Sequence, residues 1–174
     1  MSTASISTDF PVVFSDFPNP NMFAIGVFFY GCDFKCYKCQ NPELQKSGGE
    51  KFTPQELLKE LDYRIGNLDM GIALMGGDPL AEENRDFTAD FLSINKRAVI
   101  IYTGYELDNI KNMIAGRRIL AERNFTYIKT GVFKYHLRQQ PELTDKYFQL
   151  ASSNQAIYDS DLKKLTIDGR YNFG

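Results

Sequence analysis

The sequence predicts an α/β fold, a partial, open (βα) barrel with a short parallel sheet. After residue 22, short apolar runs alternate with amphipathic helical segments, an order that gives parallel strands joined by right-handed crossovers. Each segment rich in Cys, Gly or Asp directly follows a predicted strand, at the end where ligands collect in such sheets. Four or five strands are too few to close an eight-stranded barrel, so we expect an open side covered by the tail or by a partner.

The first strand and helix have clear local signals. The run FAIGVFFY at 23–30 is apolar and aromatic, as in a buried strand. Thr53 can cap the next helix, Pro54 fits its first position, and Glu56 completes a capping box. Gly66 is a natural stop for this helix.

The remaining elements are assigned from periodicity. We expect strands at 72–75, 98–102 and 125–129, a helix from about 81 to 92, and a further helix that presents Leu107, Ile110, Met113 and Ile114 on one side. In the tail we expect only short extended pieces, near 153–158 and 163–167. One short strand candidate, 12–14, precedes the series.

Bulk properties indicate one ordinary globular domain. The chain has 174 residues, 43% of them hydrophobic, and a formal net charge of −2. We expect a lead-in at 1–21 and a single domain at 22–174 with an irregular C-terminal tail. Nothing in this charge balance favours a nucleic-acid or anionic-membrane partner. The polar N-terminus lacks a secretory signal, and the apolar run 22–30 is too short to span a bilayer, so we expect a cytoplasmic protein.

The three cysteines form a compact motif. Cys32, Cys36 and Cys39 have the spacing C-x3-C-x2-C on one loop after the first strand. Three thiolates can bind three corners of a [4Fe–4S] cluster and leave the fourth iron open. One alternative is a Cys3His zinc site that uses His136, the only histidine, in a binding module without catalysis. The other is three buried thiols that act as small hydrophobes.

The cysteine spacing and a second motif, Met75-Gly76-Gly77-Asp78-Pro79, resemble the radical S-adenosylmethionine (SAM) superfamily. The resemblance implies a [4Fe–4S] cluster on the three cysteines, with SAM as the second cofactor. Gly76, Gly77 and Asp78 would then bind the SAM amino group. Thr103, Gly104 and Tyr105, which follow another strand, would approach its methionine or ribose end. A strand-to-helix turn is an equally weighted interpretation of those last three residues.

Within this superfamily the chain resembles the small activases of anaerobic ribonucleotide reductase, over about residues 23–158. The supporting segments are Tyr30-Gly31-Cys32, Cys39-Gln40-Asn41-Pro42, Gly76-Gly77-Asp78-Pro79-Leu80, Tyr102-Thr103-Gly104-Tyr105, Tyr127-Ile128-Lys129-Thr130-Gly131 and Ser153-Asn154-Gln155. The resemblance implies reductive cleavage of SAM, an electron donor such as flavodoxin, and hydrogen abstraction from a glycine of the reductase. One departure is Lys38, which stands where many radical SAM loops have an aromatic residue.

Other radical SAM functions remain as alternatives. A small-molecule enzyme such as 7-carboxy-7-deazaguanine synthase usually has Asp-Thr after its last cysteine, whereas Gln40-Asn41-Pro42 follows here. Activases of other glycyl radical enzymes often carry additional cysteines. For Lys129, contact with SAM or the partner and a solvated strand end are equally weighted interpretations. Asn154 and Gln155 are weaker candidates for the site.

Overall fold

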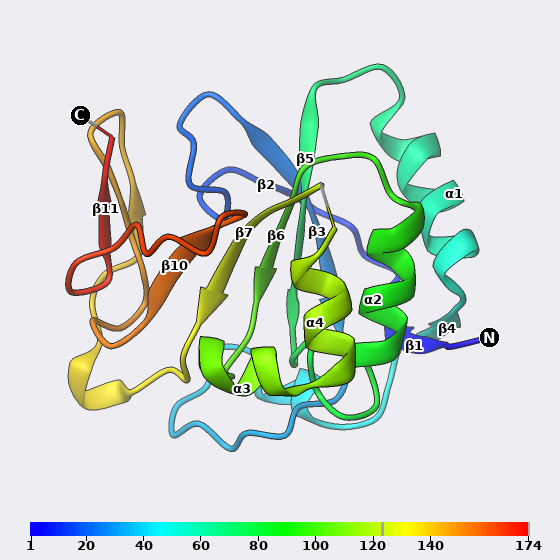
Figure 1. The fold of residues 1–174 in the computed structure, drawn as a ribbon, viewed down its shortest axis with the longest axis horizontal. Coiled ribbons are helices and arrows are strands. Elements are labelled where there is room, and N and C mark those ends of the chain that lie inside the picture. Colours follow the sequence, from blue (N-terminus) through cyan, green and yellow to red (C-terminus); the bar gives the residue numbers. More distant parts are fainter. Residues whose placement is uncertain (123, 174) are drawn as a thin grey trace.

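A mainly parallel sheet forms the centre of the molecule in the computed structural model, which describes residues 1–122 and 124–173 (Figure 1). Four strands run parallel in the order β3 (Phe23–Phe29), β5 (Met70–Gly76), β6 (Val99–Tyr102) and β7 (Phe125–Thr130). They match the four predicted strands to within two residues. The predicted fold class, a partial and open barrel, is confirmed.

Antiparallel strands extend both edges of this parallel core. β10 (Ala156–Asp159) pairs with β7 at one edge, while β1 (Ala4–Ile6) lies between β3 and β4 (Glu50–Phe52) at the other. β2 (Val12–Val13), near the predicted candidate, pairs with β3. The first 21 residues therefore contribute two strands to the main sheet.

Helix α1 (Pro54–Ile65) has the predicted capping box. The Thr53 hydroxyl accepts a hydrogen bond from the Glu56 backbone N–H at 3.3 Å, and the Thr53 backbone N–H donates to the Glu56 carboxylate at 2.8 Å. Leu57, Leu61 and Ile65 are buried on one face of the helix, which is the apolar face of an amphipathic helix.

The other helices differ in their bounds from the predictions. α2 (Arg85–Ile94) begins later, because residues 78–84 form turns whose backbone bonds run from Ala81 to Asp78 and from Asn84 to Ala81. The helix expected from Leu107 is two helices, α3 (Leu107–Asn112) and α4 (Ile114–Leu120), since Met113 has an extended backbone. The bend brings Gly116 so close to Ile110 that a Cβ would lie 2.0 Å from its carbonyl oxygen.

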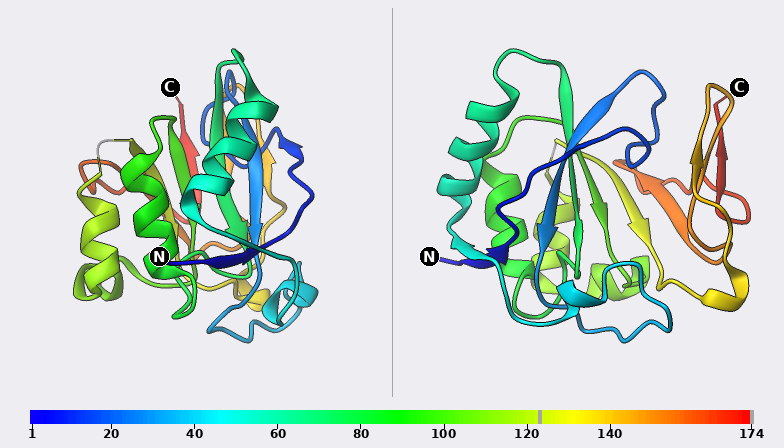
Figure 2. Two further views of the ribbon diagram at one scale, coloured as in Figure 1. Left: turned by 90° about the vertical axis from the view of Figure 1, so that its right-hand side faces the viewer. Right: turned by 180° about the vertical axis from the view of Figure 1, so that it is seen from behind.

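The helices cover one face of the sheet, and a separate cluster covers part of the opposite, inner face (Figures 1 and 2). Phe17 packs there against Ala24, Ala73 and Ile100. Gly71 makes room for it, because a Cβ would lie 2.7 Å from the Phe17 ring. This Phe17 plug fills the inner face near the beginnings of the strands and leaves the strand ends open.

The tail contains a second, three-stranded antiparallel sheet of β8 (Glu142–Leu143), β9 (Tyr147–Gln149) and β11 (Arg170–Asn172). It stands beyond β10 at the open edge of the main sheet (Figures 1 and 2). Of the two predicted extended pieces, 153–158 overlaps β10. In 163–167, which was expected to be extended, Lys164 makes only an isolated bridge to Tyr158 and Ile167 one to Arg170.

Two short 3-10 helices complete the fold, η1 (Pro42–Gln45) after the cysteines and η2 (Tyr135–Leu137) before the small sheet. Within the described ranges, none of the helices combines the length and apolar character needed to cross a membrane.

Candidate functional site

The ends of the parallel strands surround a cavity of about 370 Å³, a volume in the range of roughly 300–1,000 Å³ typical of small-molecule sites. Eight of the nine predicted site residues line it, namely Cys32, Cys36, Cys39, Gly76, Gly77, Asp78, Thr103 and Gly104. The topology explains this convergence, because loops after neighbouring parallel strands meet at one edge of the sheet.

The cysteine loop, residues 30–41, leaves β3 through Gly31, whose φ of 90° suits glycine. The Gly31 N–H donates to the Leu44 carbonyl at 2.8 Å and thereby fixes the base of the loop. All three thiols are free and partly exposed. Burial raises the pKa of the Cys32 thiol to about 11, so a metal centre is the group that would hold it as a thiolate.

The cysteine arrangement fits a polynuclear cluster. Each thiolate of such a cluster binds a different iron, so the three sulfur atoms need not converge on one point. Among residues 1–122 and 124–173, no group of three or more His, Cys, Asp or Glu side chains is gathered closely enough to hold a single metal ion. His136, the fourth ligand of the zinc alternative, is exposed in η2 and is absent from the described lining of the cavity.

The glycine-rich turn after β5 packs directly on the cysteine loop. The Gly77 N–H donates to the Phe29 carbonyl and the Asp78 N–H to the Gly31 carbonyl, both at 2.8 Å. A Cβ on Gly77 would lie 2.2 Å from the Gly31 carbonyl oxygen. This turn therefore requires glycine for close backbone packing, independently of any ligand.

Asp78 joins the turns that follow β5 and β6. Its carboxylate is buried, with Oδ1 accepting from the Leu80 N–H at 2.8 Å and Oδ2 from the Thr103 hydroxyl at 3.0 Å and the Gly104 N–H at 2.8 Å. Burial raises the pKa of Asp78 to about 6, although these hydrogen bonds favour the ionised form. Asp78 is therefore mostly ionised at neutral pH, and Oδ1 retains capacity to accept a further bond.

Asn84 is a structural part of the site that the sequence analysis missed. Its buried amide nitrogen donates to the Tyr30 carbonyl and to the Asp78 carbonyl, both at 2.9 Å. It thus bridges the chain just before Cys32 and the turn after β5. The one sequence signal for Asn84 is its position just before α2. That position usually indicates an N-cap, so it does not predict the bridge that Asn84 forms.

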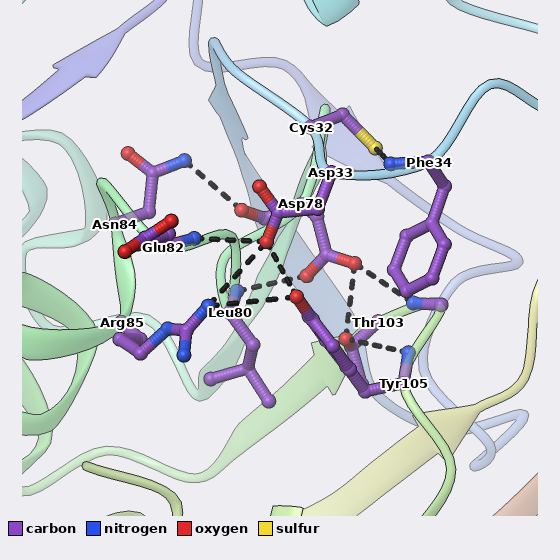
Figure 3. A network of polar contacts seen from close by, with 11 residues as sticks. Cys32, Asp33, Phe34, Asp78, Leu80, Glu82, Asn84, Arg85, Thr103 and Tyr105 are labelled. Atoms are coloured by element: carbon purple, nitrogen blue, oxygen red, sulfur yellow. Dashed lines mark hydrogen bonds and ion pairs between the residues drawn. The ribbon is translucent and has the colours of Figure 1, made fainter. Parts of the chain in front are cut away.

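Tyr105 is the predicted site residue that is not among the described cavity-lining residues. Its hydroxyl donates to Asp33, and its ring lies edge-on to Phe34 with centroids 4.8 Å apart. Figure 3 shows the hydrogen bond from Tyr105 to Asp33 in the cysteine loop. Phe34 in turn covers Gly104, where a Cβ would lie 2.6 Å from the ring, and itself lines the cavity.

Lys129 also lines the cavity, and only 8% of its surface is exposed. The interpretation as a solvated strand end is therefore wrong. Its ammonium donates to the Gly131 carbonyl at 3.2 Å and lies 5.6 Å from the centroid of the Tyr102 ring. Burial lowers the pKa of Lys129 to about 8, while the negative charge of Asp78 acts in the opposite direction. The cavity thus contains a buried cation and a buried anion.

The tail completes the cavity wall through Phe148, Gln149 and Leu150. Gln155 also lines it and donates to the Gly131 carbonyl at 3.1 Å, whereas the Asn154 amide donates to the Val132 carbonyl at 2.9 Å. Sequence reasoning missed this contribution from β9, since its three residues are too few to show a period.

Comparisons with known proteins agree with this geometry. Residues 23–158 match the family model described as a 4Fe–4S single cluster domain, a range that includes all three cysteines and both predicted turns. The chain is 28% identical over 104 residues to the anaerobic ribonucleoside-triphosphate reductase-activating protein of Enterobacteria phage T4, which covers 56% of this chain and 67% of that protein. It is 31% identical over 96 residues to the pyruvate formate-lyase-activating enzyme of Clostridium pasteurianum, and this alignment covers 51% of this chain and 40% of that enzyme.

These matches confirm the resemblance to radical SAM activases. The aligned part spans about two thirds of the phage protein and less than half of the clostridial enzyme. The family match extends over most of the described chain and includes the cysteine loop and the strand ends that surround the cavity. This chain therefore belongs to the 4Fe–4S single cluster domain family.

Proposed function

We propose that this chain is a cytoplasmic radical SAM activase that forms the glycyl radical of an anaerobic ribonucleotide reductase. The observation that carries the proposal is the cavity shared by Cys32, Cys36 and Cys39 with the turns after β5 and β6. Two relatives of the chain are named as activating proteins, and the one named for ribonucleoside-triphosphate reductase has the larger share of its length aligned.

The cysteines are the proposed ligands of the cluster. Each thiolate would bind one iron, so that one iron remains open to SAM. When bound, the cluster and SAM supply reductive cleavage of SAM and a radical able to abstract hydrogen from glycine, with flavodoxin as the proposed electron donor. The protein has to hold these groups in place and keep water away from them.

The two charged residues of the cavity suit the methionine end of SAM. The ammonium group of SAM would face the Gly76 and Gly77 backbone and the free acceptor capacity of Asp78. Its carboxylate would face the Lys129 ammonium. Asp78 and Lys129 are buried side chains that line the cavity, so their electrostatic interactions with the two charged groups of SAM would be stronger than in water. Thr103 and Gly104 are proposed near the methionine or ribose end, held there by their bonds to Asp78.

The open side of the half-barrel suits a macromolecular substrate. The tail narrows this side with Phe148 and Leu150, two apolar side chains that can exclude water once a substrate segment enters. A glycine-bearing loop of a partner protein is a substrate of suitable shape. This argument applies to glycyl radical enzymes in general, so the identity of the partner depends on the comparison with the phage protein.

The test is reconstitution under nitrogen, followed by iron and sulfide analysis and electron paramagnetic resonance. We expect about four irons per chain and, with SAM and a reductant, a glycine-centred signal on an anaerobic ribonucleoside-triphosphate reductase. One zinc without sulfide would refute the cluster. A full content of iron and sulfide, together with a radical on pyruvate formate-lyase and none on the reductase, would favour the activity for which the second relative is named.

A further inference from the structure

Asp33, the residue after Cys32, forms a contact that the proposed reaction does not use. Its Oδ2 accepts hydrogen bonds from the Tyr105 hydroxyl, from the Glu82 N–H at 2.9 Å and from Arg85 Nη2 at 3.4 Å (Figure 3). Glu82 and Arg85 follow β5, whereas Tyr105 follows β6. One carboxylate oxygen in the cysteine loop is therefore tied to the connections after two other strands.

These contacts continue into the buried part of the site. The Tyr105 N–H donates to the Thr103 hydroxyl at 3.1 Å, and that hydroxyl donates to Asp78. Burial and the bond to Asp33 raise the pKa of Tyr105 to about 12, so its hydroxyl remains a donor at neutral pH. The set of Asp33, Tyr105 and Arg85, here called the Asp33 clasp, thus holds the outer side of the cysteine loop, while Asp78 holds its inner side.

The clasp also pairs the negative charge of Asp33, the residue after Cys32, with the positive charge of Arg85. Asp33 is bonded directly to Cys32 in the chain, and the cation paired with it is Arg85, whose guanidinium lies 5.8 Å from the centroid of the Tyr105 ring. The Arg85 and Asp33 side chains are 24% and 35% exposed, so water screens their fields only in part. A negative charge opposes the addition of an electron nearby, and a positive charge favours it.

We infer that the Asp33 clasp positions the cysteine loop, and that the balance between Asp33 and Arg85 sets how readily the cluster bound by that loop accepts an electron. The inference depends on the cluster of the proposed function, but not on the identity of the glycyl radical partner. Reduction adds one electron from an external one-electron reductant and requires no proton. Asp33, Tyr105 and Arg85 act through the loop and are positioning residues.

The test is a redox titration of the reconstituted protein without SAM, with dithionite as the reductant and the reduced cluster detected by electron paramagnetic resonance. Asp33→Asn should increase the ratio of reduced to oxidised cluster at a fixed potential, and Arg85→Met should decrease it, each by about tenfold, which is ~59 mV for one electron. The double variant should lie near the wild type, because both charges are removed. Arg85→Lys should also remain near the wild type.

Glu43→Gln is the matched control, since it removes one negative charge from η1, close in sequence to Cys39, at an exposed side chain. It should shift the ratio far less than Asp33→Asn. Tyr105→Phe, which removes a neutral donor, should speed the loss of iron to a chelator. Shifts of the same sign for Asp33→Asn and Arg85→Met, or shifts no larger than that of Glu43→Gln, would overturn the inference.

Iron and sulfide are counted before each titration. Wild-type protein without a [4Fe–4S] cluster would refute the proposed function itself, whereas an intact cluster with unshifted ratios would refute only the clasp. If Asp33→Asn fails to retain iron, the sign of the Arg85→Met shift decides the electrostatic part, because Arg85 lies in α2 and outside the cysteine loop.

Discussion

The two walls of the cavity are held in different ways. On the sheet side, the Asp78 N–H donates to the Gly31 carbonyl and the Asn84 amide donates to the Tyr30 carbonyl, and these two bonds join the cysteine loop to the turn after β5. On the tail side, the contacts that join the cysteine loop to η2 are exposed, with the Lys38 ammonium 3.1 Å from the Tyr135 hydroxyl. Buried polar networks are strong and rigid, whereas exposed cation–aromatic contacts contribute only ~0.5–1 kcal/mol.

The tail side also includes a residue with a strained backbone conformation. Lys38 has a φ of 54°, a left-handed conformation that residues other than glycine seldom adopt. The charged groups of Lys38 and Arg138 both contact the Tyr135 ring, 4.4 Å and 4.1 Å from its centroid. We infer that the sheet wall fixes the cofactors, while the tail wall can adjust to a substrate. The following predictions test this contrast.

The largest effect is expected from loss of a cluster ligand. Replacing any one of Cys32, Cys36 or Cys39 by Ala should abolish SAM cleavage, because each proposed thiolate binds its own iron. The fold should persist, since the three thiols are only partly buried. Iron content and SAM cleavage are the measurements, and His136→Ala should leave both unchanged. Loss of metal in the His136 variant would support the alternative of a Cys3His zinc site.

The next largest effect is expected from Gly77→Val. A side chain here would meet the Gly31 carbonyl oxygen, so we expect the free energy of unfolding to fall by about 2–4 kcal/mol and iron to be lost as the loop is displaced. Chemical denaturation and iron analysis measure these effects. Gly66→Ala is the comparison, because open space surrounds that site and only its backbone, with φ 56° and ψ −125°, causes strain, worth ~1–3 kcal/mol. Full iron content in Gly77→Val would show that the turn tolerates displacement.

A third prediction separates stability from binding at Lys129. Its lowered pKa means that the buried charge opposes folding at neutral pH; this cost begins to fall as the pH rises above about 8 and is gone above the unfolded-state pKa of 10.5. Lys129→Met should therefore raise the free energy of unfolding by about 1–3 kcal/mol, while SAM affinity falls about tenfold through loss of a charged contact.

The same residues predict a pH profile for SAM affinity. In the wild type, affinity should decrease above about pH 8 as Lys129 loses its proton, and below about pH 6 as Asp78 gains one. In Lys129→Met the decrease at high pH should become smaller, and the part that remains comes from the α-amino group of SAM, whose own pKa is about 8. Equilibrium SAM binding measured between pH 5 and 9 tests this, and an unchanged profile in the variant would remove Lys129 from the proposed site.

The smallest effect is expected on the tail wall. Tyr135→Leu removes the ring that Lys38 and Arg138 contact and should lower the free energy of unfolding by less than ~1 kcal/mol. Iron content should remain that of the wild type, while a chelator should remove iron faster because the contacts of Tyr135 with Lys38 and Tyr37 in the cysteine loop are lost. A loss of iron comparable to that of Gly77→Val would show that the two walls are equally important.

Local signals predicted the parts of the molecule that depend on local chemistry. The Thr53 capping box, the four parallel strands and the convergence of the cysteines with the turns after β5 and β6 follow from short patterns and from topology. The contacts of Asp33, Asn84 and Lys129 depend on partners that are distant in the sequence. Tyr105 shows the same limit, because its motif placed it near the cavity but could not give the direction of its ring.

The antiparallel edges and the tail sheet were harder to predict. β1, β8, β9 and β11 are two or three residues long, so no alternation of apolar residues can be recognised in them. The break at Met113 was equally invisible, since the apolar spacing on either side fits one continuous helix. The break goes with the close approach of Gly116 to Ile110, which a residue with a Cβ would not permit.

The Phe17 plug has a consequence for the order of events in the proposed reaction. Because Phe17 fills the inner face near the beginnings of the strands, ligands cannot approach the cavity from that end. SAM and a substrate segment would therefore share the approach from the side of the strand ends. For the proposed activase this favours a compulsory sequence in which SAM binds before the glycine-bearing loop, and the spent fragments of SAM depart only after the activated partner has withdrawn.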